Sequence, residues 1–324
     1  MTLLKTATDY QGDDGCGEAA IKGPEGQEED ELSLYESFQS NWVVVPQVRS
    51  LFETVYGVRT HYVTAGEGEP LILIHGGGPG ASGATAWAQT IPALAKHFKV
   101  YAIDLIGNGS TDIPDCEFSL QTLVEHVAGF IDTLKLPKVR IMGNSQGAYV
   151  AAKYTLDNPG RVKSLAIIST GNLASACGFE SKGKAEPLPR FDGSRETLEA
   201  FLRMIVNDPA RLPKELIDAR FAIASRPGHK EMFQSIGRYR KLTMEDASIR
   251  QAWYVRERMV ALTIPYCIIW GENDRTAPLD PQGLAMKELL PHIPFHVVKG
   301  AGHQVHNDKP DDCNKLLLEH FLKH

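Results

Sequence analysis

The chain has 324 residues, of which 43% are hydrophobic, and this suits one large globular domain or two small ones. Its 34 Lys and Arg residues against 40 Asp and Glu residues give a formal net charge of −6. This acidic balance argues against nucleic acid and against an anionic membrane as partners. Five dispersed cysteines without a C-x-x-C pair indicate reduced thiols rather than a disulfide framework. Because the sequence has no apolar run that could span a bilayer and no apolar block at its N-terminus, we expect a cytoplasmic protein.

Residues 1–32 differ in composition from the rest of the chain. They hold nine acidic residues and only two lysines, so they can bury little apolar surface to offset the entropy lost on ordering. We predict a flexible acidic tail here, with an acidic interaction arm as the alternative.

From residue 51 onward, short apolar runs alternate with helical patterns, which is typical of βαβ units and a mainly parallel sheet. The expected strands are residues 51–56, 58–63, 71–74, 100–103, 139–142, 165–168, 266–270 and 295–298. The expected helices of this α/β core are residues 84–97, 120–134, 146–156, 281–290 and 311–322.

Between residues 171 and 258 the strand pattern stops and only helical patterns remain. Leu198, Phe201, Leu202 and Ile205, for example, recur with the spacing of an amphipathic helix. We therefore predict a core of residues 33–170 and 259–324, with residues 171–258 inserted after the sixth strand as a helical cap. Insertions after a strand end commonly cover the functional site at that edge of the sheet.

A G-x-S-x-G motif at residues 143–147 lies between a predicted strand and a predicted helix. This is the strand–turn–helix setting of a nucleophile elbow, in which two glycines permit a tight turn and the serine hydroxyl projects from the sheet. Ser145 is the candidate nucleophile. The motif alone would also fit an ordinary glycine-rich turn with a capping serine.

Asp274 and His303 each follow a predicted strand, in the segments Trp270-Gly-Glu-Asn-Asp274 and Gly300-Ala-Gly-His303. An aspartate can orient a histidine, and that histidine can act as the general base for a serine. The order Ser145, Asp274, His303 is the chain order of the triad in the α/β-hydrolases. The sequence therefore predicts a Ser-His-Asp triad.

A glycine-rich loop, His75-Gly-Gly-Gly-Pro-Gly-Ala-Ser-Gly83, follows the third predicted strand. Acyl transfer requires N–H donors directed at a developing oxyanion, and the expected donors are the backbone N–H groups of Gly77 and Gln146. The same loop also contains G-x-G-x-x-G at residues 78–83, with Asp104 twenty-one residues further on, which fits a dinucleotide-binding fingerprint. That alternative leaves the elbow, Asp274 and His303 without a role.

Together, these segments closely resemble the meta-cleavage-product hydrolases, which are C–C bond hydrolases of the α/β-hydrolase fold. The resemblance covers roughly residues 45–324 and rests on the glycine loop, the elbow, Trp270-Gly-x-x-Asp274-Arg275 and Gly302-His303. It implies an enzyme without a metal or organic cofactor. Its substrate would be a vinylogous 1,5-diketone from aromatic ring cleavage, which is ketonised and then cleaved by water next to the ketone.

Arg220 falls within the apolar stripe of the predicted helix 213–225, where an unpaired charge is costly. It could bind a substrate carboxylate, as an arginine of the corresponding cap region does in the family, or reach solvent or a core acid. The other candidate substrate-binding residues are Gly76, Gly78 and Gln304. No metal site is expected, since His303, His306 and Asp308 lack the usual ligand spacing.

The sequence differs from the family where tryptophan and asparagine are usual: Gln304 follows His303, and Ala84 and Ala86 follow the glycine loop. These differences leave another β-diketone, an ester or a lactone open as the small-molecule substrate. The alternative functions are a carboxylesterase or lactonase with the same triad, and a non-catalytic ligand receptor of the same fold. A homodimer also stays open.

Overall fold

The structure, a computed structural model, describes residues 48–116 and 118–324 of the chain. The predicted acidic tail, residues 1–32, lies outside the described residues. Four cysteines are described, Cys116, Cys177, Cys267 and Cys313, and all four are free thiols.

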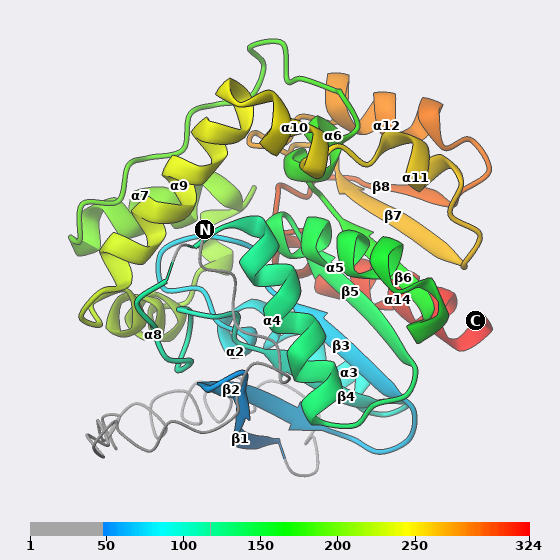
Figure 1. The fold of residues 1–324 in the computed structure, drawn as a ribbon. Helices are drawn as coiled ribbons and strands as arrows, with labels where there is room; N and C mark the ends of the chain where they lie inside the picture. The colour runs from blue at the N-terminus through cyan, green and yellow to red at the C-terminus, as the bar shows by residue number, and fades with distance from the viewer. Residues whose placement is uncertain (1–47, 117) are drawn as a thin grey trace.

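One eight-stranded sheet runs through the molecule in the order β1-β2-β4-β3-β5-β6-β7-β8 (Figure 1). Strands β3 to β8 are parallel, while β2 pairs antiparallel with both β1 and β4. All eight predicted strands are present, so the prediction of a mainly parallel sheet is confirmed. Their bounds are β1 (Arg49–Val55), β2 (Val58–Ala65), β3 (Pro70–Ile74), β4 (Lys99–Ile103), β5 (Val139–Asn144), β6 (Val162–Ile168), β7 (Tyr266–Gly271) and β8 (Phe295–Val298).

Helices lie on both faces of this sheet (Figure 1). Among the described residues, four α-helices come before the predicted cap: α2 (Gly83–Trp87), α3 (Ile91–Leu94), α4 (Leu120–Thr133) and α5 (Gln146–Asp157). Those that follow β7 are α12 (Leu284–Leu289), α13 (Val305–Asp308) and α14 (Pro310–Lys323).

Two of the predicted helices differ from the structure. The helix expected over residues 84–97 is two short helices, α2 and α3, because Pro92 has no N–H to donate to the preceding turn. The helix expected over residues 281–290 begins as α12 only at Leu284, after a separate helical turn whose Asp280 has extended backbone angles. The short helix α13, directly after His303, was not expected.

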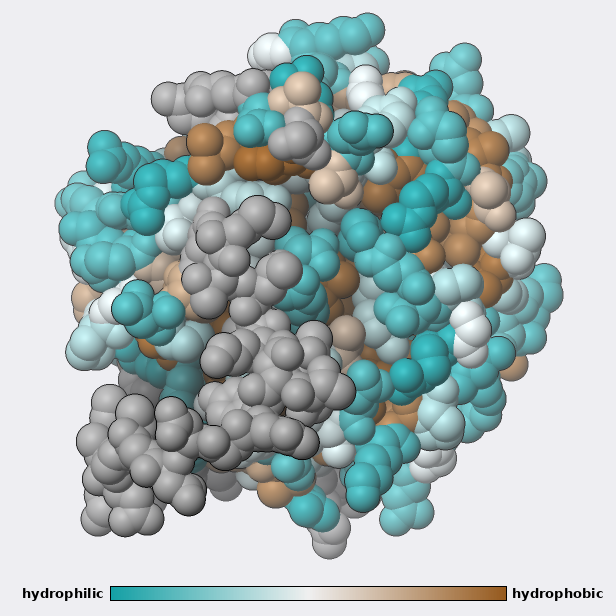
Figure 2. All heavy atoms as spheres, viewed as in Figure 1, coloured by the Kyte–Doolittle hydropathy of each residue, from teal (hydrophilic) through white to brown (hydrophobic). Residues whose placement is uncertain are grey.

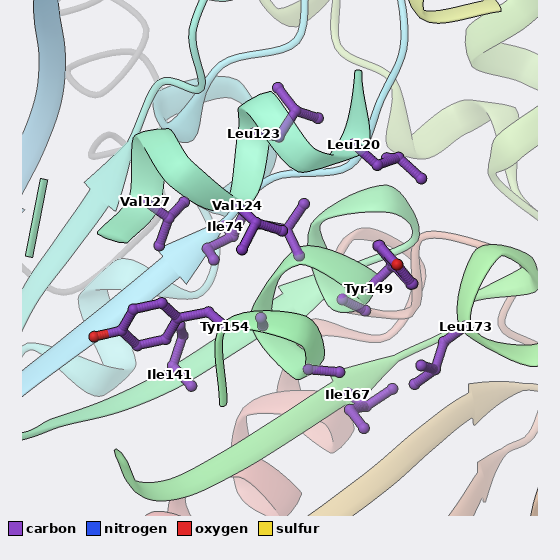
Figure 3. Packing of buried hydrophobic residues seen from close by; sticks show 14 of the residues in the cluster. Ile74, Leu120, Leu123, Val124, Val127, Ile141, Tyr149, Tyr154, Ile167 and Leu173 are labelled. Carbon is purple, nitrogen blue, oxygen red and sulfur yellow. The ribbon is translucent and has the colours of Figure 1, made fainter. Parts of the chain in front are cut away.

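Successive side chains along a strand point to opposite faces of the sheet, so the core consists of two apolar clusters, one on each face. On β3, Ile72 and Ile74 pack with α4 and α5, while Leu71 and Leu73 pack on the opposite face with α2, α3 and α14. Figure 3 shows the first of these faces, with Val124 and Val127 of α4 above Ile74. Covering both faces in this way leaves the C-terminal strand ends as the edge where the loops meet.

Six helices stand between β6 and β7 in the interval where the sequence predicts the cap, and no strand is described there. They are α6 (Gly171–Ala176), α7 (Arg195–Ile205), α8 (Lys214–Ala224), α9 (His229–Glu245), α10 (Ala247–Trp253) and α11 (Arg256–Val260). Residues of α7 and α8 form a third apolar cluster, separate from the two sheet faces.

The described surface in Figure 2 is a mosaic of hydrophilic and hydrophobic residues. No helix among the described residues is both long and apolar enough to cross a membrane.

Candidate active site

Ser145 occupies the sharp turn between β5 and α5. Its φ of 55° lies in the left-handed region, which is strained for a residue with a Cβ. The turn is held because the Ser145 N–H donates to the carbonyls of Ile168 (3.0 Å) and Ser169 (3.1 Å). Side chains at Gly143 and Gly147 would overlap neighbouring backbone, so both glycines of the motif are sterically required. The backbone therefore has the geometry expected of a nucleophile elbow.

His303 and Asp274 are hydrogen-bonded to each other on neighbouring loops. The Nδ1 of His303 donates to Oδ2 of Asp274 over 2.7 Å, and both side chains are buried. The second carboxylate oxygen of Asp274 accepts the N–H groups of Thr276 (2.9 Å) and Ala277 (2.8 Å). In a neutral imidazole, a donor at Nδ1 leaves Nε2 as the acceptor, which is the tautomer needed in a general base.

Ser145 and His303 line one cavity of about 610 Å³, so the structure brings the predicted nucleophile and base to a common space. Gly77, Gly78, Gln146 and Gln304 line the same cavity. Gly76 lies directly behind Ser145, since a Cβ on Gly76 would be 3.3 Å from the Ser145 Cβ.

The N–H of Gln146 is the first of helix α5, where a helix offers donors that have no partner within the helix. A Cβ on Gly77 would be 2.9 Å from the side-chain oxygen of Gln146, so the glycine loop and the elbow are in close contact. This is the arrangement in which two backbone N–H groups can face one oxyanion.

Neutral histidines hold the glycine loop in place. His75 Nε2 accepts the Leu105 N–H over 3.0 Å, and His75 Nδ1 donates to the Gly76 carbonyl over 2.8 Å. His229, from the first turn of α9, accepts the Gly80 N–H over 3.0 Å. Burial lowers the pKa of His75, and it lowers the pKa of His229 to about 4. Both rings therefore stay neutral at ordinary pH and can keep accepting these hydrogen bonds.

Asp104 supports the same loop and has no free carboxylate for a nucleotide. It is fully buried, accepts the Gly83 N–H over 2.6 Å and the Ser110 N–H over 2.9 Å, and binds His61 Nδ1 over 2.7 Å. The dinucleotide interpretation would need this carboxylate at a ribose hydroxyl. The structure instead uses Asp104 to fix the start of α2.

Sequence reasoning about function missed Asn144 and Asp308, which hold the loops of the predicted triad. Asn144 lines the cavity, and its side-chain Nδ2 donates to the carbonyls of Ile168 (3.2 Å) and His303 (3.1 Å), which links the elbow to the histidine loop. Asp308 accepts the N–H groups of Gly302 (2.7 Å) and Asn207 (2.9 Å). Asn144 could have been suspected from its place within the elbow motif, whereas no local pattern marks Asp308.

No group of three or more His, Cys, Asp or Glu side chains in the described part of the chain is arranged to hold a metal ion. His306, which the sequence places near Asp308, stacks on Trp87 with 4.4 Å between the ring centroids.

Arg220 is buried beside the glycine loop rather than in the wall of the cavity. Its Nε donates to the Pro79 carbonyl over 3.0 Å, and its Nη2 has no hydrogen-bond partner among the described residues. A Cβ on Gly78, which does line the cavity, would be 3.1 Å from that Nη2. Burial lowers the pKa of Arg220 to about 10, so the guanidinium keeps its charge at neutral pH.

Two other arginines, Arg190 and Arg238, do line the cavity. Sequence reasoning missed both, because Arg190 lies in the loop between α6 and α7 and Arg238 carries no distinguishing pattern on α9.

Known proteins match this arrangement over most of the chain. The sequence profile of the alpha/beta hydrolase fold matches residues 69–310. A 2-hydroxy-6-oxononadienedioate/2-hydroxy-6-oxononatrienedioate hydrolase of Paraburkholderia phymatum is 32% identical over 270 residues, covering 81% of this chain and 90% of the relative. A 2-hydroxy-6-oxo-6-phenylhexa-2,4-dienoate hydrolase of Burkholderia cepacia is 29% identical over 299 residues, covering 88% and 97%.

Among solved structures, a meta-cleavage product hydrolase from Pseudomonas fluorescens IP01 superposes with a TM-score of 0.68. Its sequence is 28% identical, and the match covers 85% of this chain and 98% of that one. The chain therefore belongs to the alpha/beta hydrolase fold family. Within that family it belongs with the meta-cleavage product hydrolases.

Proposed function

We propose that Ser145, His303 and Asp274 form the catalytic triad of a hydrolase that cleaves a C–C bond next to a ketone in a 2-hydroxy-6-oxo-dienoate. The observation that carries this proposal is the His303–Asp274 hydrogen bond of 2.7 Å at a cavity that Ser145 also lines. The similarity to hydrolases named for such dienoates supports the choice of substrate class.

In this reaction the dienoate is first ketonised, and water then adds across the C–C bond. The carbonyl carbon receives the hydroxyl group and leaves as a carboxylic acid, while the carbon of the dienoate fragment receives the proton. His303 moves the proton, Asp274 holds the imidazole in the required tautomer, and Ser145 is the nucleophile or activates the attacking water.

Addition to the ketone places negative charge on its oxygen. The N–H groups of Gly77 and Gln146 would stabilise that oxyanion, and the start of α5 adds a favourable field. The strained turn at Ser145 and the hydrogen bonds of His75 and His229 keep these donors in place before the substrate arrives. No metal ion or organic cofactor has a role in this sequence of steps.

Arg220 is the proposed partner of the dienoate carboxylate. A buried, charged guanidinium nitrogen without a described partner is costly, and an anion beside Gly78 would satisfy it. Helices α6 to α11 would act as the cap, because α8 supplies Arg220 and α9 supplies both His229 and part of the cavity wall.

The test is a comparison of a yellow ring-cleavage dienoate with p-nitrophenyl esters, using wild type and Ser145→Ala. We expect faster turnover of the dienoate, and a fall of at least about 10³-fold in kcat for Ser145→Ala with the fold retained. Circular dichroism and the unfolding midpoint check the fold of the variant. Activity like that of wild type in Ser145→Ala would exclude the triad, and turnover of esters alone would favour a carboxylesterase.

A further inference from the structure

The cavity wall has a strongly one-sided charge. Among the described residues that line it, two are arginines, Arg190 and Arg238, and none is an aspartate or glutamate. This contrasts with the whole chain, in which acidic residues outnumber Lys and Arg by 40 to 34. A concave wall with charge of one sign raises the local concentration of ligands of the opposite sign.

Neither arginine has a hydrogen-bond or ion-pair partner among the residues that the structure describes. Other arginines of the same region are paired: Arg195 binds Asp218 over 2.5 Å, and Arg203 lies 3.6 Å from Glu199. Arg190 and Arg238 therefore keep their donors available, although they come from separate elements, the loop before α7 and helix α9.

The two arginines stand apart from the residues assigned to the reaction itself. Ser145, His303 and the oxyanion donors come from loops of the sheet, whereas Arg190 and Arg238 come from the cap. The same wall also contains large apolar side chains, among them Phe191, Phe201 and Phe233. Such a wall suits the carbon chain of a substrate, with a polar group expected at its cap end.

We infer that Arg190 and Arg238 bind a second carboxylate of the substrate, on the opposite side of the ketone from the dienoate carboxylate. This rests on the proposed function and narrows the substrate to a dianionic dienoate. A monoanionic substrate would use the buried Arg220 alone, whereas a dianion can also contact Arg190 and Arg238, which are solvent-exposed where they line the cavity. Guanidinium groups suit this role because they bind carboxylates through two parallel hydrogen bonds.

The test compares two dienoates that share the reacting part and differ at the far end. One is 2-hydroxy-6-oxononadienedioate, which ends in a carboxylate, and the other is 2-hydroxy-6-oxo-6-phenylhexa-2,4-dienoate, which ends in a phenyl ring. For Arg190→Ala and Arg238→Ala we expect KM for the dioate to rise about 10- to 100-fold, with kcat nearly unchanged. KM for the phenyl substrate should stay within about threefold of wild type, and Arg238→Lys should restore part of the dioate affinity.

Arg211→Ala is the matched control, because Arg211 is an exposed arginine of the same region that does not line the cavity. It should leave KM unchanged for both substrates. This result would show that the effect of Arg190 and Arg238 comes from direct contact with the substrate and not from the overall positive charge of the cap. Equal losses on both substrates in the Arg190 and Arg238 variants, or no loss on the dioate, would overturn the inference.

Failure of the proposed function gives a different result, namely that wild type cleaves neither dienoate. Calorimetric titration of wild type and Arg238→Ala with the dioate then decides the inference by itself. Binding that weakens about tenfold or more in the variant supports it, and equal binding overturns it.

Discussion

His306 is fully buried three residues after His303, and neither of its ring nitrogens has a described hydrogen-bond partner. Burial lowers its pKa to about 3, so the ring is neutral where it stacks on Trp87. An unsatisfied buried polar atom costs about 1–3 kcal/mol, and phenylalanine keeps the shape while removing both nitrogens. We therefore expect His306→Phe to raise the free energy of unfolding by about 1 kcal/mol or more, measured by urea denaturation.

His126 offers the contrasting substitution. Its Nδ1 accepts the Ile106 N–H over 3.1 Å, and its Nε2 bonds to Thr60 Oγ1 over 2.8 Å. His126→Phe should therefore destabilise the protein by about 1–3 kcal/mol, because it leaves a buried N–H without an acceptor. If His306→Phe destabilises the protein as much as His126→Phe does, bound water satisfies the nitrogens of His306.

The residues of the predicted triad share a property that the sequence makes visible. Each one follows a short apolar run, so its place at a strand end can be predicted before the fold is known. Arg190 and Arg238 have no such marker, since a loop and an exposed helix face commonly carry arginines. Which of them reach a cavity depends on how the cap packs on the core, and that packing is long-range.

At the scale of elements, the glycine loop is in direct contact with helix α8. Gly80 has a φ of 65°, and a Cβ there would overlap the carbonyl oxygen of Arg220. The Gly80 N–H also donates to His229 of α9. A side chain at this position must therefore displace either the loop or both helices, because neither the backbone angle nor the space can accommodate it.

Gly80→Ala is expected to destabilise the protein by about 2 kcal/mol or more and to lower kcat, because the neighbouring oxyanion donor moves with the loop. Gly160→Ala is the control, since no atom of the described residues lies within 4 Å of a Cβ at that exposed glycine. It should change stability by less than about 0.5 kcal/mol and leave kcat unaltered. Equal effects of the two substitutions in urea denaturation and in turnover would contradict this account of the loop.

Sequence periodicity predicted the strands better than it predicted the short helices. The strands of the parallel sheet are continuous apolar runs, such as Leu71–Ile74, and burial on both faces makes such runs easy to recognise. The expected helix over residues 84–97 has the right periodicity, but the missing N–H at Pro92 divides it. The helix α13 is only four residues long, too short for periodicity to detect.

At the scale of the whole molecule, the histidine loop and the cap are joined through backbone groups. The Gln304 N–H donates to the Ile205 carbonyl over 3.0 Å, and Asp308 accepts the N–H groups of Asn207 and Asp208. The side chain of Arg275, next to Asp274, donates to the carbonyls of Arg203 (2.7 Å) and Val206 (3.1 Å). The end of α7 is thereby fixed to both loops that carry the predicted base and its aspartate. None of these contacts is visible in a single sequence, because each joins segments that are about 70 to 100 residues apart.

Buried neutral histidines also connect the stability of the whole fold to pH. Burial lowers the pKa of His126 and His306 to about 3 and that of His229 and His320 to about 4, against an ordinary value of 6.5. Below pH 6.5 the unfolded chain therefore takes up protons that the folded chain does not. The contribution of these neutral histidines to the free energy of unfolding is complete above about pH 6.5, and it is lost as the pH falls toward 4 and 3.

Each of these four histidines can remove up to about 1.4 kcal/mol of stability per pH unit within that interval. His75, whose pKa is also lowered by burial, acts in the same direction. The raised pKa of buried Asp308 acts in the opposite direction, but it is one group against five. We expect the urea midpoint of wild type to fall steadily from pH 7 to pH 5, with an uptake on unfolding of about four to five protons. His306→Phe should reduce that uptake by about one proton, because one titrating ring is gone. A urea midpoint that stays constant over this range would show that these rings are already protonated in the folded protein, and the hydrogen bond from Gly80 to His229 could then not exist as described.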